Sequence, residues 1–411
     1  MHGGNQITTA GVYCLASAVF IGFAGLWWTA QPGALPPAVM IGATTGLGSE
    51  VAMYLLFWRR QVRFAPMRCE YQAIRDWALI LGVGTAALGT IATLLHLAIG
   101  GHIALGGLCA LTIALVMRGS GSGGRQLRLL APCFIVLFYV NTAFTGYGRL
   151  NIITLGLVAL ITLSTAEQNK YKITKSITLL GVAPTTIYMV HLRQRFSLDT
   201  IGTQLSGIGS IVNPLKTFGD LVMAHEHGQF GFAHGSSFIS SGLFWVPRAY
   251  WENKPVGFGS VLTSTLYPNL SGTGYSMAGL TWAEWYYNFG WLGLLPMVVI
   301  IGLLIRTIDR WRESASSGAI VNRRQHFHAM LSLLLGAYIV NLMWDGSFTF
   351  CSRVGQDLIG TVIIFGLSSS KRPHLHVPRT SLTSRKLVRI APELPIARRT
   401  RRRDCLGEQS R

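Results

Sequence analysis

The chain has 411 residues, of which 50% are hydrophobic and only 12% are charged. A soluble domain of average composition carries about 25% charged residues, so these values exclude an ordinary soluble protein and indicate a membrane protein. The formal net charge is +19, and the segment 368–411 holds twelve Lys and Arg residues against three acids. We interpret this segment as a cytoplasmic tail on anionic lipid rather than a nucleic-acid-binding region.

Apolar segments of about 20 residues predict membrane-spanning helices. The first, Gly11 to Trp28, lacks a preceding basic stretch and a cleavage site, so it is expected to span rather than act as a cleaved signal peptide. The chain predicts an all-α polytopic fold of about ten transmembrane helices, at 10–30, 36–57, 77–98, 102–117, 129–147, 150–163, 176–192, 282–305, 329–345 and 354–367.

Basic residues orient these predicted helices, because cytoplasmic loops carry an excess of Lys and Arg. Sixteen Lys and Arg residues follow the even-numbered helices, before the basic tail is counted, whereas the short loops on the other side hold only Arg149 and Arg353. Both termini are therefore expected in the cytoplasm of a bacterium, with the chain in its inner membrane. The predicted organisation is helices 1–7 in 1–192, a large periplasmic loop in 193–281, helices 8–10 in 282–367 and a basic tail in 368–411.

The large loop ends in a segment with two prolines, Pro247 and Pro255, and several groups suited to a lipid-linked sugar. Arg248 and Lys254 can bind phosphate oxygens, and the rings of Tyr250 and Trp251 lie between them in sequence. The alternative is an interfacial anchor in which the same residues meet lipid headgroups. Composition alone does not separate the two interpretations.

The outer end of the eighth predicted helix carries Glu284, Tyr287, Asn288 and Trp291, which share one helical face because of their i, i+3, i+4 and i+7 spacing. A carboxylate inside a membrane helix is costly and points to function. The alternative is that Glu284 lies in interfacial water at the beginning of the helix.

Further polar residues are predicted at the periplasmic ends of the helices. Arg193 and Arg195 leave the seventh helix, Asp345 ends the ninth, and Arg353 and Asp357 flank the beginning of the tenth. They are expected to face one cavity, or, alternatively, Asp345 and Arg353 form a simple ion pair.

Histidines and cysteines predict no metal site and no disulfide framework. The sequence His225-Glu226-His227 lacks a third ligand at a suitable spacing, and the six cysteines are scattered. His234 is a weaker candidate for a general base.

Three motifs in this order resemble the bacterial O-antigen polymerases, the Wzy-type oligosaccharide repeat-unit polymerases. They are Pro-Arg-x-x-Trp-x-x-Lys-Pro, Gly-x-Ser and Glu-x-x-Tyr-Asn-Phe-Gly-x-x-Gly, and they cover about fifty residues. The motif positions are Pro247, Arg248, Trp251, Lys254, Pro255, Gly274, Ser276, Glu284, Tyr287, Asn288, Phe289, Gly290 and Gly293. Such polymerases often carry an Arg-Gly-Asp-like triplet near the last helix, whose nearest equivalent here is Arg353-Val354-Gly355-Gln356-Asp357.

The resemblance implies a glycosyltransferase without metal or cofactor, acting on undecaprenyl-diphosphate-linked glycans as donor and acceptor among membrane lipids. A chain-length-determining protein is a further implied partner. Glu284 is the first choice for the general base, followed by His234 and Asp345, and Arg248 is the principal diphosphate ligand. The implied substrate-binding residues are Lys254, Arg193, Arg195, Arg353, Trp251, Tyr250, Tyr287 and Asn288. An O-antigen ligase that uses the same donor and a lipid-linked oligosaccharide flippase or other transporter are the alternatives.

Overall fold

The computed structural model describes residues 6–59, 72–97, 99–117, 122–142, 149–166, 181, 208–247, 249–272, 276–316 and 323–370. The regular elements in these ranges are all helical. The chain divides into Met1–Arg372 and Pro373–Arg411, and only the first unit contains described residues. The predicted seventh helix apart from residue 181, the basic tail beyond Ser370 and the site residues Arg193, Arg195 and Arg248 lie outside the described ranges.

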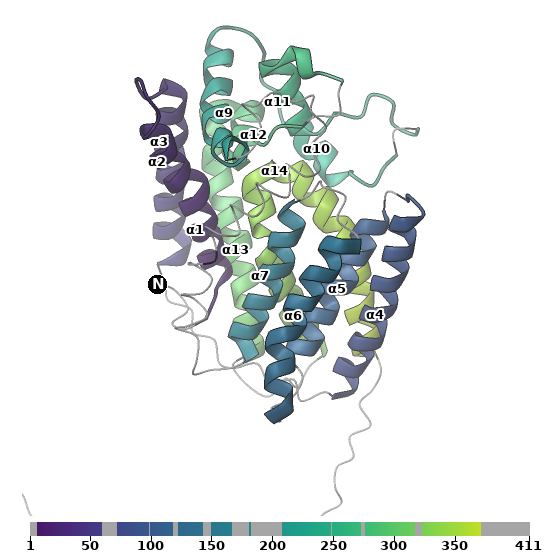
Figure 1. The fold of residues 1–411 in the computed structure, drawn as a ribbon. Coiled ribbons are helices and arrows are strands. Elements are labelled where there is room, and N and C mark those ends of the chain that lie inside the picture. The colour runs from purple at the N-terminus through teal and green to yellow at the C-terminus, as the bar shows by residue number, and fades with distance from the viewer. Residues whose placement is uncertain are drawn as a thin grey trace, which may run out of the picture. The chain divides into compact units, whose positions relative to one another are not determined.

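The first half of the chain forms a series of apolar helices (Figure 1). These are α1 (Thr9–Ser17), the π-helix η1 (Ala18–Phe23), α2 (Ala24–Thr29), α3 (Pro37–Met53), the π-helix η2 (Tyr54–Trp58), α4 (Gln72–Leu94), α5 (Gly100–Val116), α6 (Ser122–Thr142) and α7 (Arg149–Ala166).

The second half adds α9 (Gly209–Glu226), α10 (Ser236–Gly242), α11 (Phe258–Leu266), the 3-10 helix η4 (Pro268–Leu270), α12 (Leu280–Phe289), the 3-10 helix η5 (Gly290–Gly293), α13 (Leu294–Ser316) and α14 (Arg323–Ser370).

Four helical stretches of the described chain are long and apolar enough to cross a membrane. They are Thr9–Thr29, Pro37–Trp58, Leu280–Ser314 and Phe327–Ile364. Shorter apolar helices cover Ala78–Leu94, Gly100–Val116, Leu130–Thr142 and Leu150–Thr165. The protein is therefore an all-α protein with the character of a membrane protein, while the count of ten spans and their sidedness stay predictions.

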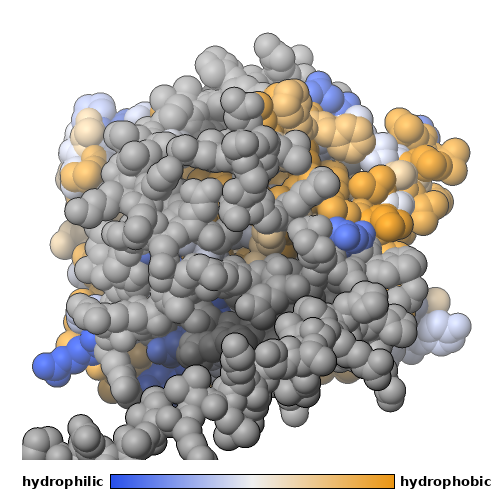
Figure 2. Space-filling view, turned by 90° about the horizontal axis from the view of Figure 1, so that it is seen from below, coloured by the Kyte–Doolittle hydropathy of each residue, from blue (hydrophilic) through white to orange (hydrophobic). Residues whose placement is uncertain are grey.

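Large apolar side chains are exposed on several of these helices. Leu88 on α4 and Phe134 on α6 are each 67% exposed, and Leu295 on α13 is 68% exposed. Figure 2 shows hydrophobic side chains gathered at the rim of the molecule, in a view from below. Soluble monomers rarely expose apolar surface on this scale, so these faces suit contact with lipid chains.

Part of the segment predicted as a periplasmic loop is a helix packed along α3. A side chain at Gly219 of α9 would collide with the backbone of Ala38, and one at Gly42 of α3 would collide with the backbone of Leu215. Close approach of two helices at small residues is typical of membrane proteins. The large apolar side chains of α9 that are buried follow a helical period: they are Val212, Leu215, Phe218, Leu221 and Val222.

The helix α14 consists of two segments, 323–345 and 347–370, which meet at Gly346 with φ 77° and ψ −171°. The sequence analysis placed the end of the ninth helix at Asp345, next to this break. Figure 1 shows α14 bending at the end of the molecule where α10, α11 and α12 gather. The break is therefore the point at which these peripheral helices meet the long apolar ones.

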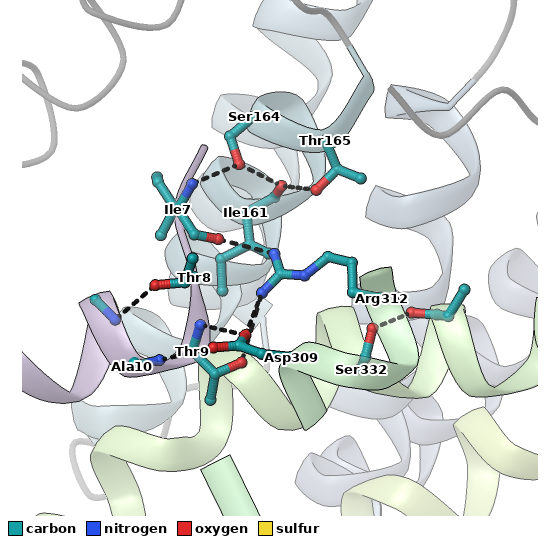
Figure 3. A network of polar contacts seen from close by, with 12 residues as sticks. Ile7, Thr8, Thr9, Ala10, Ile161, Ser164, Thr165, Asp309, Arg312 and Ser332 are labelled. Atoms are coloured by element: carbon teal, nitrogen blue, oxygen red, sulfur yellow. Dashed lines mark hydrogen bonds and ion pairs between the residues drawn. The ribbon is translucent and has the colours of Figure 1, made fainter. Parts of the chain in front are cut away.

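Arg312 was counted with the cytoplasmic loop residues, but the structure buries it completely in α13 (Figure 3). Its guanidinium lies 3.1 Å from the carboxylate of Asp309 and donates to the carbonyl of Ile7 at 2.8 Å. Asp309 in turn accepts from the backbone N–H of Thr9 at 2.8 Å, in the first turn of α1. The charge is tolerated because it is paired and hydrogen-bonded, and the network fixes the beginning of α1 against α13.

Candidate functional site

Glu284 is completely buried in α12 and joins three segments of the chain. One carboxylate oxygen accepts a hydrogen bond from the hydroxyl of Ser237 in α10 at 3.0 Å. The other accepts from the backbone N–H of Ser347, the first residue of the second segment of α14. The first N–H groups of a helix lack intrahelical partners, and the helix dipole favours a negative charge there. These donors offset the cost of burying the carboxylate.

Gly346 permits this arrangement. Its φ and ψ angles fall in a region that residues with a side chain almost never adopt. A Cβ atom at this position would lie 2.6 Å from Oε2 of Glu284. The break in α14 and the position of the carboxylate therefore depend on the same glycine.

Asn288 lies one turn after Glu284 and fastens α10 to α12. Its amide nitrogen donates to the hydroxyl of Ser237 and to the carbonyl of Glu284, both at 2.7 Å. Its amide oxygen accepts from the backbone N–H of Gly235 at 3.0 Å. Both side chains reach Ser237, as their i, i+4 spacing predicts. Through these contacts Asn288 holds α10 against α12, and its predicted contact with substrate stays a prediction.

His234 and Tyr287 lie next to this cluster. The backbone N–H of His234 donates to the carbonyl of Asn288 at 3.0 Å, and His234 has a positive φ of 47°. The ring of Tyr287 packs 5.6 Å from the rings of Phe230 and Phe258. The structure thus places the backbone of His234 against Asn288 and the ring of Tyr287 among aromatic neighbours, and their predicted roles as base and sugar ligand stay predictions.

The proline-flanked loop is held against the second segment of α14. The ammonium of Lys254 is largely buried and donates to the carbonyls of Phe244 and Val246, each at 2.9 Å. A side chain at Gly355 would collide with the ring of Phe244. Lys254 therefore ties the segment after Pro247 back to Phe244 and Val246.

The two aromatic residues of this loop differ in exposure. Tyr250 is 87% exposed, whereas Trp251 is partly buried. An exposed ring beside a fixed loop is accessible to the apolar face of a sugar. The predicted sugar contacts of both rings stay predictions.

Asp345 and Arg353 form an ion pair at 2.8 Å across the break in α14. This pairing is the alternative to a shared cavity that the sequence left open. The side chain of Arg353 is still 31% exposed and that of Asp345 is 15% exposed. The pair therefore lies at the margin of the site, with part of the guanidinium accessible.

A second polar cluster, which the sequence analysis did not identify, joins α5 to α14. Asp357 is buried and its carboxylate lies 2.9 Å from Nδ1 of His102, while its second oxygen accepts from the hydroxyl of Tyr338 at 2.8 Å. His102 and Asp357 are 255 residues apart, so spacing could not connect them. The available signal was an ionisable residue in each of two apolar segments.

The two histidines of the His225-Glu226-His227 sequence contact backbone carbonyls. Nδ1 of His225 lies 3.0 Å from the carbonyl oxygen of Phe230, and Nδ1 of His227 lies 2.6 Å from that of Met223. No group of three or more His, Cys, Asp or Glu residues within metal-binding reach occurs in the described ranges.

No protein-family model matches the chain, and no curated protein or solved structure is significantly similar to it.

Proposed function

We propose that this protein polymerises undecaprenyl-diphosphate-linked oligosaccharide repeat units into O-antigen or a related surface polysaccharide. The reaction is glycosyl transfer at the periplasmic face of the bacterial inner membrane. One observation supports the proposal: Glu284 of the third motif and the loop next to the first motif both contact the second segment of α14. Glu284 contacts Ser347, and the loop that begins at Phe244 packs on Gly355.

The chemistry of these residues suits a lipid-linked diphosphate. Charge develops on the departing diphosphate in the transition state, and cations placed beside it lower the barrier. Part of the Arg353 guanidinium is exposed beside its pair with Asp345, and Arg248 directly follows Pro247 in the sequence. The exposed ring of Tyr250 offers a face for a sugar, and the apolar outer surfaces of the helices suit the polyprenyl chain.

Deletion of the gene tests the proposal. The mutant should make lipopolysaccharide with a core and a single repeat unit, because repeat units are still exported and ligated but not joined to each other. Silver-stained gels of lipopolysaccharide report this pattern directly.

The two alternatives give different patterns. Loss of a ligase leaves polymer on undecaprenyl diphosphate, and loss of a flippase leaves no exported repeat units. Either pattern would refute the polymerase proposal.

A further inference from the structure

His102, Asp357 and Tyr338 form a buried acid–histidine pair with a supporting hydroxyl. The carboxylate of Asp357 accepts from Tyr338 with one oxygen and contacts Nδ1 of His102 with the other. When the carboxylate is ionised, Nδ1 carries the proton that it donates, and Nε2 is left as an acceptor. In the described part of the chain Nε2 has no hydrogen-bond partner.

A proton-transfer group needs one accessible nitrogen and a fixed ring, and the exposure of the three side chains fits this requirement. The side chain of His102 is 25% exposed, whereas those of Asp357 and Tyr338 are buried. The two buried groups therefore hold one edge of the imidazole, and its other edge is accessible. In serine hydrolases the same acid–histidine geometry fixes the tautomer and stabilises the imidazolium.

The position along the helices connects this pair to the proposed diphosphate site. Arg353 and Asp357 are four residues apart in α14, on one helical face and about 6 Å apart along the axis. His102 lies in the first turn of α5, whose Gly106 packs against the backbone of Asp357. A diphosphate bound at Arg353 would therefore lie about one helical turn from the residue that contacts His102.

Glu284 is less suited to accept a proton than His102. It is completely buried, and both of its oxygens accept hydrogen bonds from Ser237 and Ser347. Because its side chain has no exposed surface, an acceptor hydroxyl could reach Glu284 only if the packing of α10, α12 and α14 around it opened. The geometry therefore makes Glu284 a positioning residue that holds α10 and the second segment of α14 in place.

We propose that His102, oriented by Asp357 and Tyr338, is the general base of the transfer reaction; this inference rests on the proposed function. The acceptor hydroxyl oxygen forms a bond to the anomeric carbon of the donor sugar, and its proton passes to Nε2 of His102. The bond between the anomeric carbon and the diphosphate oxygen breaks, and its electron pair leaves with the diphosphate. The resulting imidazolium pairs with the carboxylate of Asp357 and then releases the proton to water.

The test uses full-length protein in membrane vesicles supplied with lipid-linked repeat units, and it measures the initial rate of elongation. His102→Gln removes the ring nitrogen that takes the proton, so elongation should fall about 100-fold or more. Asp357→Asn should also lower the rate, because the amide favours the wrong tautomer of His102. His328→Gln is the matched control, since His328 stacks on Trp311 at a ring distance of 4.9 Å, near the beginning of α14.

Chemical rescue separates a proton-transfer role from a structural one. Elongation by His102→Ala should recover in part when imidazole is added, and the recovery should follow the basicity of substituted imidazoles. Glu284→Gln should cost less activity than His102→Gln per folded molecule, because a carboxamide still accepts from Ser347. Folded protein is measured by gel filtration in detergent for each variant.

The outcomes are distinguishable. Elongation by His102→Gln at the rate of the control would refute the inference alone, as would a folded His102→Ala that imidazole does not restore. Absence of elongation by the wild-type protein would refute the proposed function and this inference together.

Discussion

Replacement of Gly346 by alanine should destabilise the protein, because two independent costs meet at this residue. The backbone region that Gly346 occupies costs a residue with a side chain about 1–3 kcal/mol. The new Cβ atom would also lie 2.6 Å from Oε2 of Glu284 and displace it from the N–H of Ser347. Loss of a hydrogen bond to a buried charged group costs roughly 1.5–3 kcal/mol. The sum predicts that the free energy of unfolding falls by about 2.5–6 kcal/mol.

The matched control is Gly156→Ala in α7, where an added Cβ atom meets no heavy atom within 4 Å. Alanine in the middle of a helix is more favourable than glycine, so this variant should be unchanged or more stable by up to about 1 kcal/mol. Purified proteins in detergent are heated, and the folded fraction is followed by gel filtration. An apparent melting temperature of Gly346→Ala equal to that of Gly156→Ala would contradict the reasoning.

Two further predictions test the topology and the diphosphate site. A reporter fused after Ser240 should be active in the periplasm, and one after Gly318 should be active only in the cytoplasm; a cytoplasmic signal at Ser240 would overturn the predicted sidedness. Arg248→Lys should slow polymerisation about ten- to hundredfold at unchanged abundance, because an ammonium lacks the planar fork that grips a diphosphate. The control Arg310→Lys lies on α13 and should give a full-length ladder, whereas a full ladder from Arg248→Lys would favour the interfacial-anchor interpretation.

The sequence predicted the helical class and many helix positions because apolar length is a property of each segment by itself. It also placed Asp345 at the end of a helix, next to the break at Gly346. It did not predict that α9 packs along α3, because the signal there is only a helical period of side chains in a segment with several polar residues. The burial of Arg312 was not predicted either. A basic residue that follows an apolar segment is expected in a loop, and its partners Asp309 and Ile7 are recognised only in the folded structure.

For the site, local spacing predicted one helical face for Glu284, Tyr287, Asn288 and Trp291. The structure brings Glu284 and Asn288 to Ser237, but α12 ends at Phe289, so Trp291 belongs to η5 instead. Ser237 itself carried no signal, because serines are common in loops and its role depends on contact with a helix 47 residues away. The pair of His102 and Asp357 required knowledge of helix packing, since the two residues lie 255 positions apart.

The structure also separates two kinds of carboxylate that sequence alone treats alike. Glu284 is stabilised by the N–H at the beginning of a helix, so its charge maintains the break in α14 and the docking of α10. Loss of activity on changing Glu284 therefore reports on folding and chemistry together. Asp357 instead holds an accessible imidazole, and changing that ring leaves the Asp357–Tyr338 hydrogen bond in place. Changing His102 removes the side-chain contact between α5 and α14 but leaves the two segments of α14 joined by Tyr338 and Asp357, so a change at His102 disturbs the packing around the break less directly than a change at Glu284.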